Sequence, residues 1–275
     1  MRLRFSMHGK AAMLVSMILV VGNHVQGEDQ HVLLSRALKI SGMSSQIKAL
    51  DQTLFSSLPA DAFSDSKTRN RAEKVLTKAA DQEALLALVH DSVKQDFDGE
   101  SLEKVLEFYN SRLGQKVGRL HGTALAPSLL RNIREGRKAV ASLDEARLTI
   151  LRRIIRSQRL IESNTELLRS VVWGLLEGFS AASGNPSEST TEIDLTAIVR
   201  AVAFPRNRTE DIAMLALANT YQSLSDKELE ELASYQESGA AARFQAAVHN
   251  GIKTALYQTA KTLGKSINNV GEPTP

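Results

Sequence analysis

Hydrophobic residues recur every three or four positions through most of this chain, and that spacing predicts α-helices. The pattern is clearest between Ser101 and His121, where the apolar side chains share one face of a helical projection. No stretch alternates strictly between apolar and polar positions, as a half-buried strand would. We therefore expect an all-α protein. The apolar positions on this face are Leu102, Val105, Leu106, Tyr109, Leu113, Val117 and Leu120.

The same reasoning predicts helices before and after this segment, with turn residues between them. Two stretches, Ser142–Glu145 and Ser225–Glu228, have the Ser-x-x-Glu pattern of a capping box at a helix start. Thr209 is a further predicted cap. We expect breaks at Gly42 and, more weakly, at Gly251. The predicted helices cover residues 32–58, 67–80, 83–95, 101–124, 128–140, 142–182, 192–204 and 210–222, and a last pair between 226 and 265.

The Ser101–His121 segment returns in altered form 127 positions later, at Glu228–Val248. The register continues upstream without a gap, so that 83–95 aligns with 210–222. A long ungapped match of this kind is typical of a duplicated helical unit, although two unrelated amphipathic helices also share an apolar period. We predict two tandem related repeats packed as one helical bundle or a short solenoid-like body. Their predicted bounds are 28–141 and 142–265, followed by a frayed tail at 266–275.

Within the first copy, the stretch FYNSRLGQK has an aromatic pair, short polar residues, and then a glycine and a basic residue. The residues are Phe108, Tyr109, Ser111, Gly114 and Lys116. This stretch resembles the signature of a family of bacterial exported helical proteins, catalogued as domain of unknown function 2059. The resemblance implies a helical fold and an exported protein. It implies no activity, because none is assigned to the family.

The N-terminus has the pattern of a secretory signal peptide. Arg2, Arg4 and Lys10 precede an apolar run at 11–21, which is too short to span a bilayer comfortably. Small and apolar residues then end at Gly27, the expected cleavage position. We predict a signal peptide at 1–27 and a periplasmic or secreted protein with no later membrane span. An uncleaved N-terminal anchor is the alternative.

The chain has 34 Lys and Arg against 31 Asp and Glu, and the three basic residues of the leader account for the excess. The charge is uneven, since 112–159 holds twelve basic and three acidic residues. This region either pairs with the acidic flanks or forms a patch for acidic lipid headgroups or a partner protein. Nucleic acid is not expected, because aromatic residues for base stacking are missing. The candidate patch consists of Arg147, Arg152, Arg153, Arg156 and Arg159.

Catalytic motifs are missing from the sequence. There is no Cys, no Gly-x-Ser-x-Gly turn and no His-Glu-x-x-His pair. The histidines after the leader, at 31, 90, 121 and 249, have no partner at metal-ligand spacing. His90 and His121 align with aliphatic residues of the second copy, which favours packed or peripheral positions. We expect Trp173 and Phe179 to be core residues, and we expect no cofactor, no metal site and no enzymatic activity.

These observations predict an exported, non-enzymatic helical protein that binds another protein or the envelope surface. The alternative is a carrier of a lipid or another apolar small molecule in a cavity between the repeats. A cavity of a few hundred Å³ with an apolar lining favours the carrier, whereas a closed core with an exposed basic patch favours the surface-binding protein.

Overall fold

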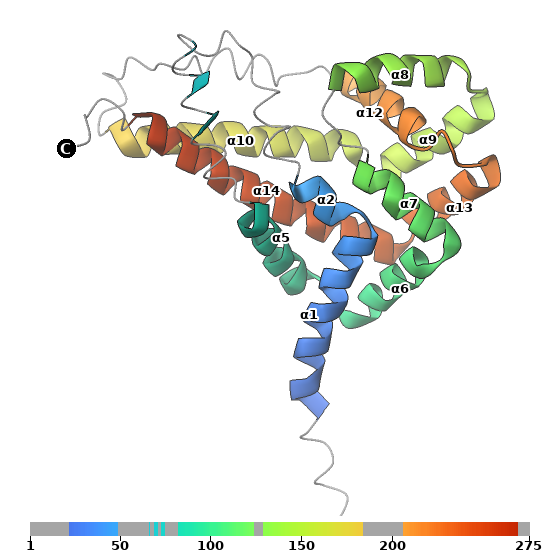
Figure 1. Cartoon of the computed structure of the whole chain (residues 1–275), viewed down its shortest axis with the longest axis horizontal. Helices are drawn as coiled ribbons and strands as arrows, with labels where there is room; N and C mark the ends of the chain where they lie inside the picture. Colours follow the sequence, from blue (N-terminus) through green and yellow to red (C-terminus); the bar gives the residue numbers. More distant parts are fainter. Residues whose placement is uncertain are drawn as a thin grey trace, which may run out of the picture.

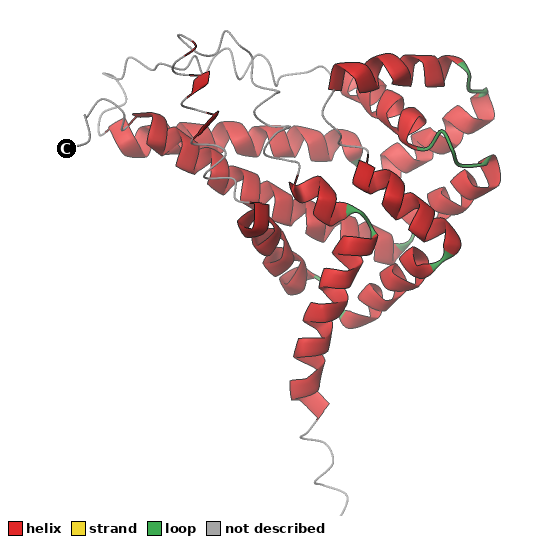
Figure 2. Ribbon diagram, in the orientation of Figure 1, coloured by secondary structure: helices red, strands yellow, loops and turns green. Residues whose placement is uncertain are grey.

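The structure, a computed structural model, describes residues 22–48, 66, 69, 70, 73, 74, 82–123, 129–183 and 206–268. Helices make up nearly all of these residues, and no strand occurs among them, which confirms the all-α prediction (Figure 2). The leader up to residue 21 and the predicted helix at 192–204 lie outside the described residues, as does most of the one at 67–80. The helices are α1 (Gly22–Ile40), α2 (Met43–Lys48), α5 (Gln82–Asp96), α6 (Gly99–Asn110), α7 (Arg112–Thr123), α8 (Leu129–Ala141), α9 (Glu145–Ser157), α10 (Leu160–Ser183), α12 (Arg206–Thr220), α13 (Asp226–Gln236) and α14 (Gly239–Asn268).

Each half of the chain starts with a helix pair joined through a left-handed residue. Gly42 has φ 79° between α1 and α2, and Arg159 has φ 50° between α9 and α10. In both breaks an amide donates to the carbonyl four residues back, at 3.0 Å for Ser41 and 3.1 Å for Gln158. The break expected at Gly42 is present. The continuous helix predicted over 142–182 is wrong, because a non-glycine residue takes the left-handed conformation that ends α9.

The second half of each repeat contains another matched break. The helix predicted over 101–124 is interrupted at Ser111, and the equivalent interruption lies at Ser238. Both serine hydroxyls accept a hydrogen bond from an amide in the next helix turn, that of Gly114 at 3.0 Å and that of Ala241 at 3.2 Å. Each serine therefore caps the helix that follows it.

Gly114 explains why the first copy bends so sharply. A Cβ built there would lie 2.0 Å from the carbonyl oxygen of Phe108, in the last turn of α6. The backbone of α7 can therefore approach α6 this closely only without a side chain at this position. Arg112 is the first residue of α7, so the bend between α6 and α7 forms without a proline.

An aromatic stack joins α6 to α13. Phe108 stacks on Tyr235 with ring centroids 3.6 Å apart and an interplanar angle of 5°. These two residues are 127 positions apart, so the predicted sequence repeat aligns them with each other.

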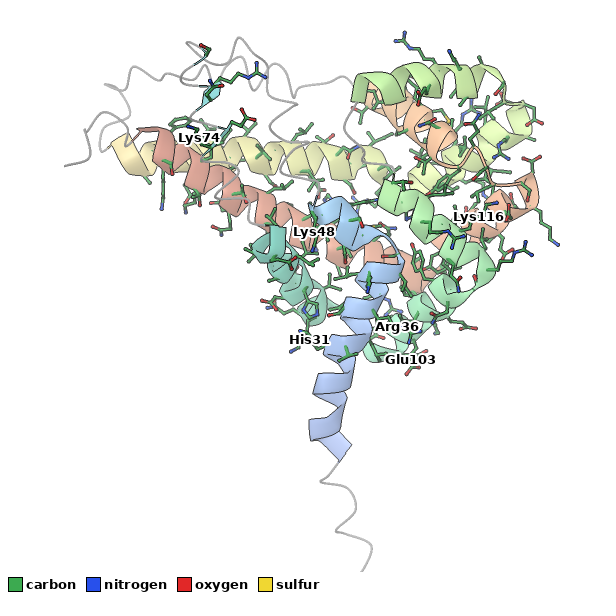
Figure 3. All side chains as sticks on the ribbon, in the orientation of Figure 1. His31, Arg36, Lys48, Lys74, Glu103 and Lys116 are labelled. Carbon is green, nitrogen blue, oxygen red and sulfur yellow. The ribbon has the colours of Figure 1, made fainter. Side chains whose placement is uncertain are left out.

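Ion pairs on either side of the stack are reciprocal. Lys116 of α7 bonds to Glu228 at the start of α13, at 2.9 Å (Lys116 is labelled in Figure 3). Its equivalent, Arg243 of α14, reaches Asp98 at the start of α6, at 3.2 Å. Lys116 is also the main cause that lowers the pKa of Glu228 to about 2. Each copy thus places a cation at the N-terminal end of the other copy's helix, where an acid is favoured by the helix dipole.

The halves exchange helices rather than packing as separate bodies (Figure 1). α5 of the first half lies against α14 of the second, and α12 of the second lies against α8 of the first. At Gly251 a Cβ would lie 2.8 Å from the Cα of Val89, so α14 and α5 cross in close contact. The break expected at Gly251 is wrong, since α14 continues through it. One hydrophobic core contains residues of both halves.

α10 and α14 run in parallel along the longest contact between two helices in the structure. Glycines allow their backbones to approach, since a Cβ at Gly178 would lie 2.2 Å from the carbonyl oxygen of Lys261. Phe179 is buried on this side, as predicted. Trp173 is 60% exposed, so the prediction that it lies in the core is wrong.

Helix starts were predicted with mixed success. Ser225 forms the expected capping box: its hydroxyl accepts from the Glu228 amide at 3.3 Å, and its own amide donates to Glu228 Oε2 at 2.8 Å. The other predicted box is wrong, because Asp144 rather than Ser142 caps α9. Thr209 does not cap α12, which begins three residues earlier at Arg206.

The buried face of α6 provides a test of this packing. Leu106 is 6% exposed, and Leu106→Asp would bury a carboxylate without a partner. We expect this variant to lose about 3 kcal/mol or more of unfolding free energy, or to aggregate, as measured by thermal and urea denaturation. Leu88→Asp is the matched control, because Leu88 of α5 is 39% exposed, and it should cost about 1 kcal/mol or less. Equal effects of the two substitutions would contradict the assigned buried face.

Candidate functional site

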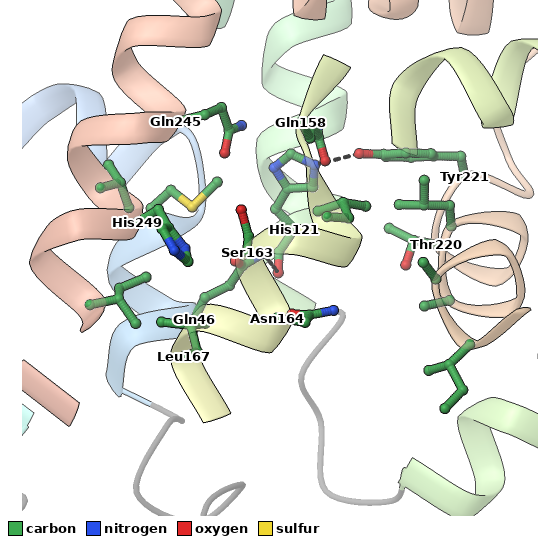
Figure 4. A pocket seen from close by; sticks show the side chains of 18 of the residues that line it. Gln46, His121, Gln158, Ser163, Asn164, Leu167, Thr220, Tyr221, Gln245 and His249 are labelled. Atoms are coloured by element: carbon green, nitrogen blue, oxygen red, sulfur yellow. Dashed lines mark hydrogen bonds between the residues drawn. The ribbon is translucent and has the colours of Figure 1, made fainter. Parts of the chain in front are cut away.

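A cavity of about 370 Å³ lies where the two repeats meet (Figure 4). α2 and α7 of the first repeat form one part of its wall, and α10, α12 and α14 of the second form the rest. Most of its surface is apolar. Aliphatic and thioether side chains supply this surface, among them Met43, Leu167, Leu217, Val248 and Ile252.

A chain of hydrogen bonds forms one end of the cavity. His121 Nδ1 lies 3.1 Å from the carbonyl oxygen of Ser41, and its Nε2 lies 2.7 Å from the hydroxyl of Tyr221, as the dashed line in Figure 4 marks. A carbonyl can only accept, so Nδ1 carries the hydrogen and Nε2 accepts from the tyrosine. The side chain of Gln158 bonds to the same hydroxyl. Every hydrogen bond in this network forms with the imidazole of His121 in its neutral state.

Burial keeps the imidazole of His121 and the phenol of Tyr221 uncharged. It lowers the pKa of His121 to about 4 and raises the pKa of Tyr221 well above its usual value. The same hydrogen bonds also connect the two helix breaks that contain a left-handed residue, since Ser41 belongs to the break at Gly42 and Gln158 to the break at Arg159. The polar end of the cavity therefore ties corresponding parts of the two repeats together.

A second groove of about 400 Å³ adjoins the cavity and shares Gln158, Ser163, Gln245 and His249 with it. His249 Nε2 lies 3.3 Å from a carboxylate oxygen of Glu166, and burial is the main cause that lowers the histidine pKa. This is a single histidine–carboxylate contact. Among the described residues no three His, Asp or Glu side chains gather in a way that could hold a metal ion.

His90 and His121, which the sequence placed in packed or peripheral positions, are both buried. Burial lowers the pKa of His90 as well. The structure brings His31 to His90, with ring centroids 4.1 Å apart. This pair is far from the cavity, on α1 and α5, and sequence spacing gave no signal for it.

The candidate basic patch is largely paired within the molecule. Arg147 bonds to Asp226 and donates to the carbonyl oxygens of Tyr221 and Leu224, at 3.0 and 2.7 Å. It thereby satisfies carbonyl groups that follow the end of α12.

Arg153 holds two carboxylates of the second copy. It bonds to Glu237 through two nitrogens, at 3.0 and 2.8 Å, and also to Glu230. The fork geometry of this contact is the strong form of an arginine–carboxylate pair. Arg153 is the first cause that lowers the pKa of Glu237.

The remaining three arginines differ in their pairing. Arg152 pairs with Glu145 of its own helix, at 2.6 Å. Arg156 and Arg159 are exposed. Arg147 and Arg153 thus pair with the acidic flank that follows the basic region, and Arg152 pairs within its own helix. Pairing with the flanks was one of the two alternatives that the charge distribution left open.

The signature-like residues have structural positions outside the cavity. Phe108 forms the aromatic stack, Tyr109 is buried beside it, Ser111 and Gly114 shape the break between α6 and α7, and Lys116 forms the ion pair with α13. None of them lines the cavity between the repeats.

Comparisons with protein families, with curated proteins and with solved structures find no match for this chain. The resemblance to the exported family therefore stays a prediction. Within the described residues, no helix has the length and apolar character needed to cross a membrane.

The buried imidazole of His121 predicts a specific pH dependence. Its pKa falls from 6.5 in the unfolded chain to about 4 in the fold, so the unfolded state binds the extra proton between these values. This contribution to stability is complete above about pH 6.5 and is lost as the pH falls towards 4. We expect it to lower the unfolding free energy by roughly 2–3 kcal/mol between pH 7.5 and 4.5, measured by urea denaturation.

The His121→Gln variant isolates this effect from other titrating groups. His90 and His249 act in the same direction, and carboxylates also titrate, but all of them remain in the variant. The decline of stability with acidification should be smaller in His121→Gln by the amount given above. An unchanged decline would show that His121 is already accessible to protons in the folded state.

Proposed function

We propose that this protein binds a small, mostly apolar molecule in the cavity between its two repeats, as an exported and non-enzymatic carrier or sensor. The observation that carries this proposal is a cavity of about 370 Å³ with a mainly apolar lining. An apolar cavity that is not refilled by side chains loses packing contacts, and a ligand that fills it restores them. The cavity lies within the usual size range of small-molecule sites.

The size of the cavity limits the ligand. An engineered apolar cavity of roughly 150 Å³ holds one benzene molecule, so a cavity about twice as large suits two fused or linked rings or a short acyl chain. A complete phospholipid would have to leave most of its length outside. The ligand is therefore a small molecule rather than a membrane lipid held whole.

Binding to an acidic envelope surface is less well supported. That hypothesis needs several arginines free on one face, whereas Arg147, Arg152 and Arg153 bond to carboxylates of the same chain. Such pairs already satisfy the guanidinium groups, so a lipid phosphate would have to compete with them. Export rests on the leader at residues 1–27 and is part of the proposal.

Binding of N-phenyl-1-naphthylamine, a neutral dye that fluoresces in apolar surroundings, tests the proposal. We expect saturable binding to the wild-type protein. Ala216 lines the cavity and is exposed, so Ala216→Trp should block the cavity without replacing a core residue. This variant should weaken dye binding at least about tenfold, which corresponds to about 1.4 kcal/mol.

Ala87→Trp is the matched control, because Ala87 is an exposed alanine on α5 that does not line the cavity. It should bind the dye like the wild type, and both variants should keep the wild-type melting temperature. No saturable binding to the wild type, or an equal loss in both variants, would overturn the proposed function.

A further inference from the structure

The described residues that line the cavity include no Lys, Arg, Asp or Glu, although these types make up 24% of the chain. Arg147 and Arg153 of α9 instead pair with carboxylates of α13. Arg159, Glu166 and Arg243 line the neighbouring groove, not the cavity. The described part of the wall therefore has no permanently charged side chain.

The two histidines of the wall do not supply a charge at neutral pH. Burial lowers the pKa of both His121 and His249. The carboxylate of Glu166 bonds to His249 and lines the neighbouring groove, not the cavity. The lining is therefore neutral as well as mainly apolar.

Carboxamide side chains are half of the polar side chains among the described lining residues. They come from five different helices or breaks, and each amide offers two donors and an acceptor. The amide nitrogen of Gln46 donates to the carbonyl oxygen of His121 at 3.2 Å, which leaves its own oxygen available. The side chains of Asn164, Asn219 and Gln245 have no hydrogen-bond partner among the described residues. The five carboxamides are Gln46, Gln158, Asn164, Asn219 and Gln245.

Figure 4 shows how these groups surround the space. Gln245 and His249 of α14 lie on one side, Thr220 and Tyr221 at the end of α12 lie on the other, and His121 lies between them in this view. Polar groups on several sides can pair with hydroxyl, carbonyl or amide groups of a ligand. The apolar side chains between them contact the rest of it.

We infer that the cavity selects uncharged ligands: mostly apolar molecules with hydroxyl, carbonyl or amide groups that bond to the carboxamides of the wall. This inference rests on the proposed function. A carboxylate, sulfonate or ammonium group would leave water, and no Lys, Arg, Asp or Glu among the described lining residues compensates its charge, which is strongly unfavourable. A neutral hydroxyl or amide loses little, because the carboxamides replace its hydrogen bonds with water.

Two dyes with the same ring system test this selectivity. N-phenyl-1-naphthylamine is neutral, and 1-anilinonaphthalene-8-sulfonate carries one negative charge on an otherwise equivalent skeleton. The affinity of the anionic dye is measured at pH 7.5 by its ability to displace the neutral dye, which excludes binding elsewhere. We expect it to be at least 30-fold weaker than that of the neutral dye. Decanamide and decanoate, tested as competitors in the same assay, should differ in the same direction.

A charge placed in the wall should change this preference. Ala216→Arg supplies a cation at the cavity, and we expect the anionic dye to bind at least tenfold more tightly than it does to Ala216→Gln, a neutral control of similar polarity. If the wild type binds both dyes equally in competition, or if the arginine variant gains nothing, the inference is overturned while the proposed function stands. If the wild type binds neither dye, the proposed function itself fails.

Discussion

Neither half of this chain covers its own hydrophobic surface. α5 needs α14 of the other half, and α12 needs α8, so the apolar faces predicted by the helical period become buried only when the halves exchange helices. The stack of Phe108 on Tyr235 adds a further contact between the halves, from α6 to α13. With no cysteine in the chain, no disulfide can reinforce it. The breaks, the ion pairs and the cavity all depend on how these helices cross.

The two halves resemble each other in the positions and hydrogen bonds of their helix breaks. Gly42 and Arg159 lie 117 positions apart, whereas Ser111 and Ser238 lie 127 apart, so the second half is longer between its two breaks. An ungapped sequence comparison therefore detects only the later helices, which keep one register. The earlier helix pairs correspond through their hydrogen bonds alone. A common origin of the two halves stays a prediction. The structure extends the comparison to the pairs α1–α2 and α9–α10, which the sequence alignment did not match.

The sequence predicted the helices far better than it predicted their ends. Helix periodicity continues across Ser111, because α6 and α7 turn their apolar faces to the same core, and so the break was missed. Arg159 was missed for another reason: arginine has no preference for the left-handed conformation, which here is imposed by packing. The sequence offered a cavity between the repeats only as an alternative, and it could not predict the lining, since the wall combines residues between Met43 and Ile252 from separate helices. One partial indication came from His121, which aligns with the aliphatic Val248 and was therefore expected in a packed or peripheral position.

The contact of α5 with α14 has a consequence for how the chain folds. These helices lie far apart in the sequence, at Gln82–Asp96 and Gly239–Asn268, so bringing them together closes a long loop. The entropy of closing such a loop opposes the contact until the packing of the two helices compensates it. We therefore expect the local helix pairs to form early in folding and the junction of α5 with α14 to form late.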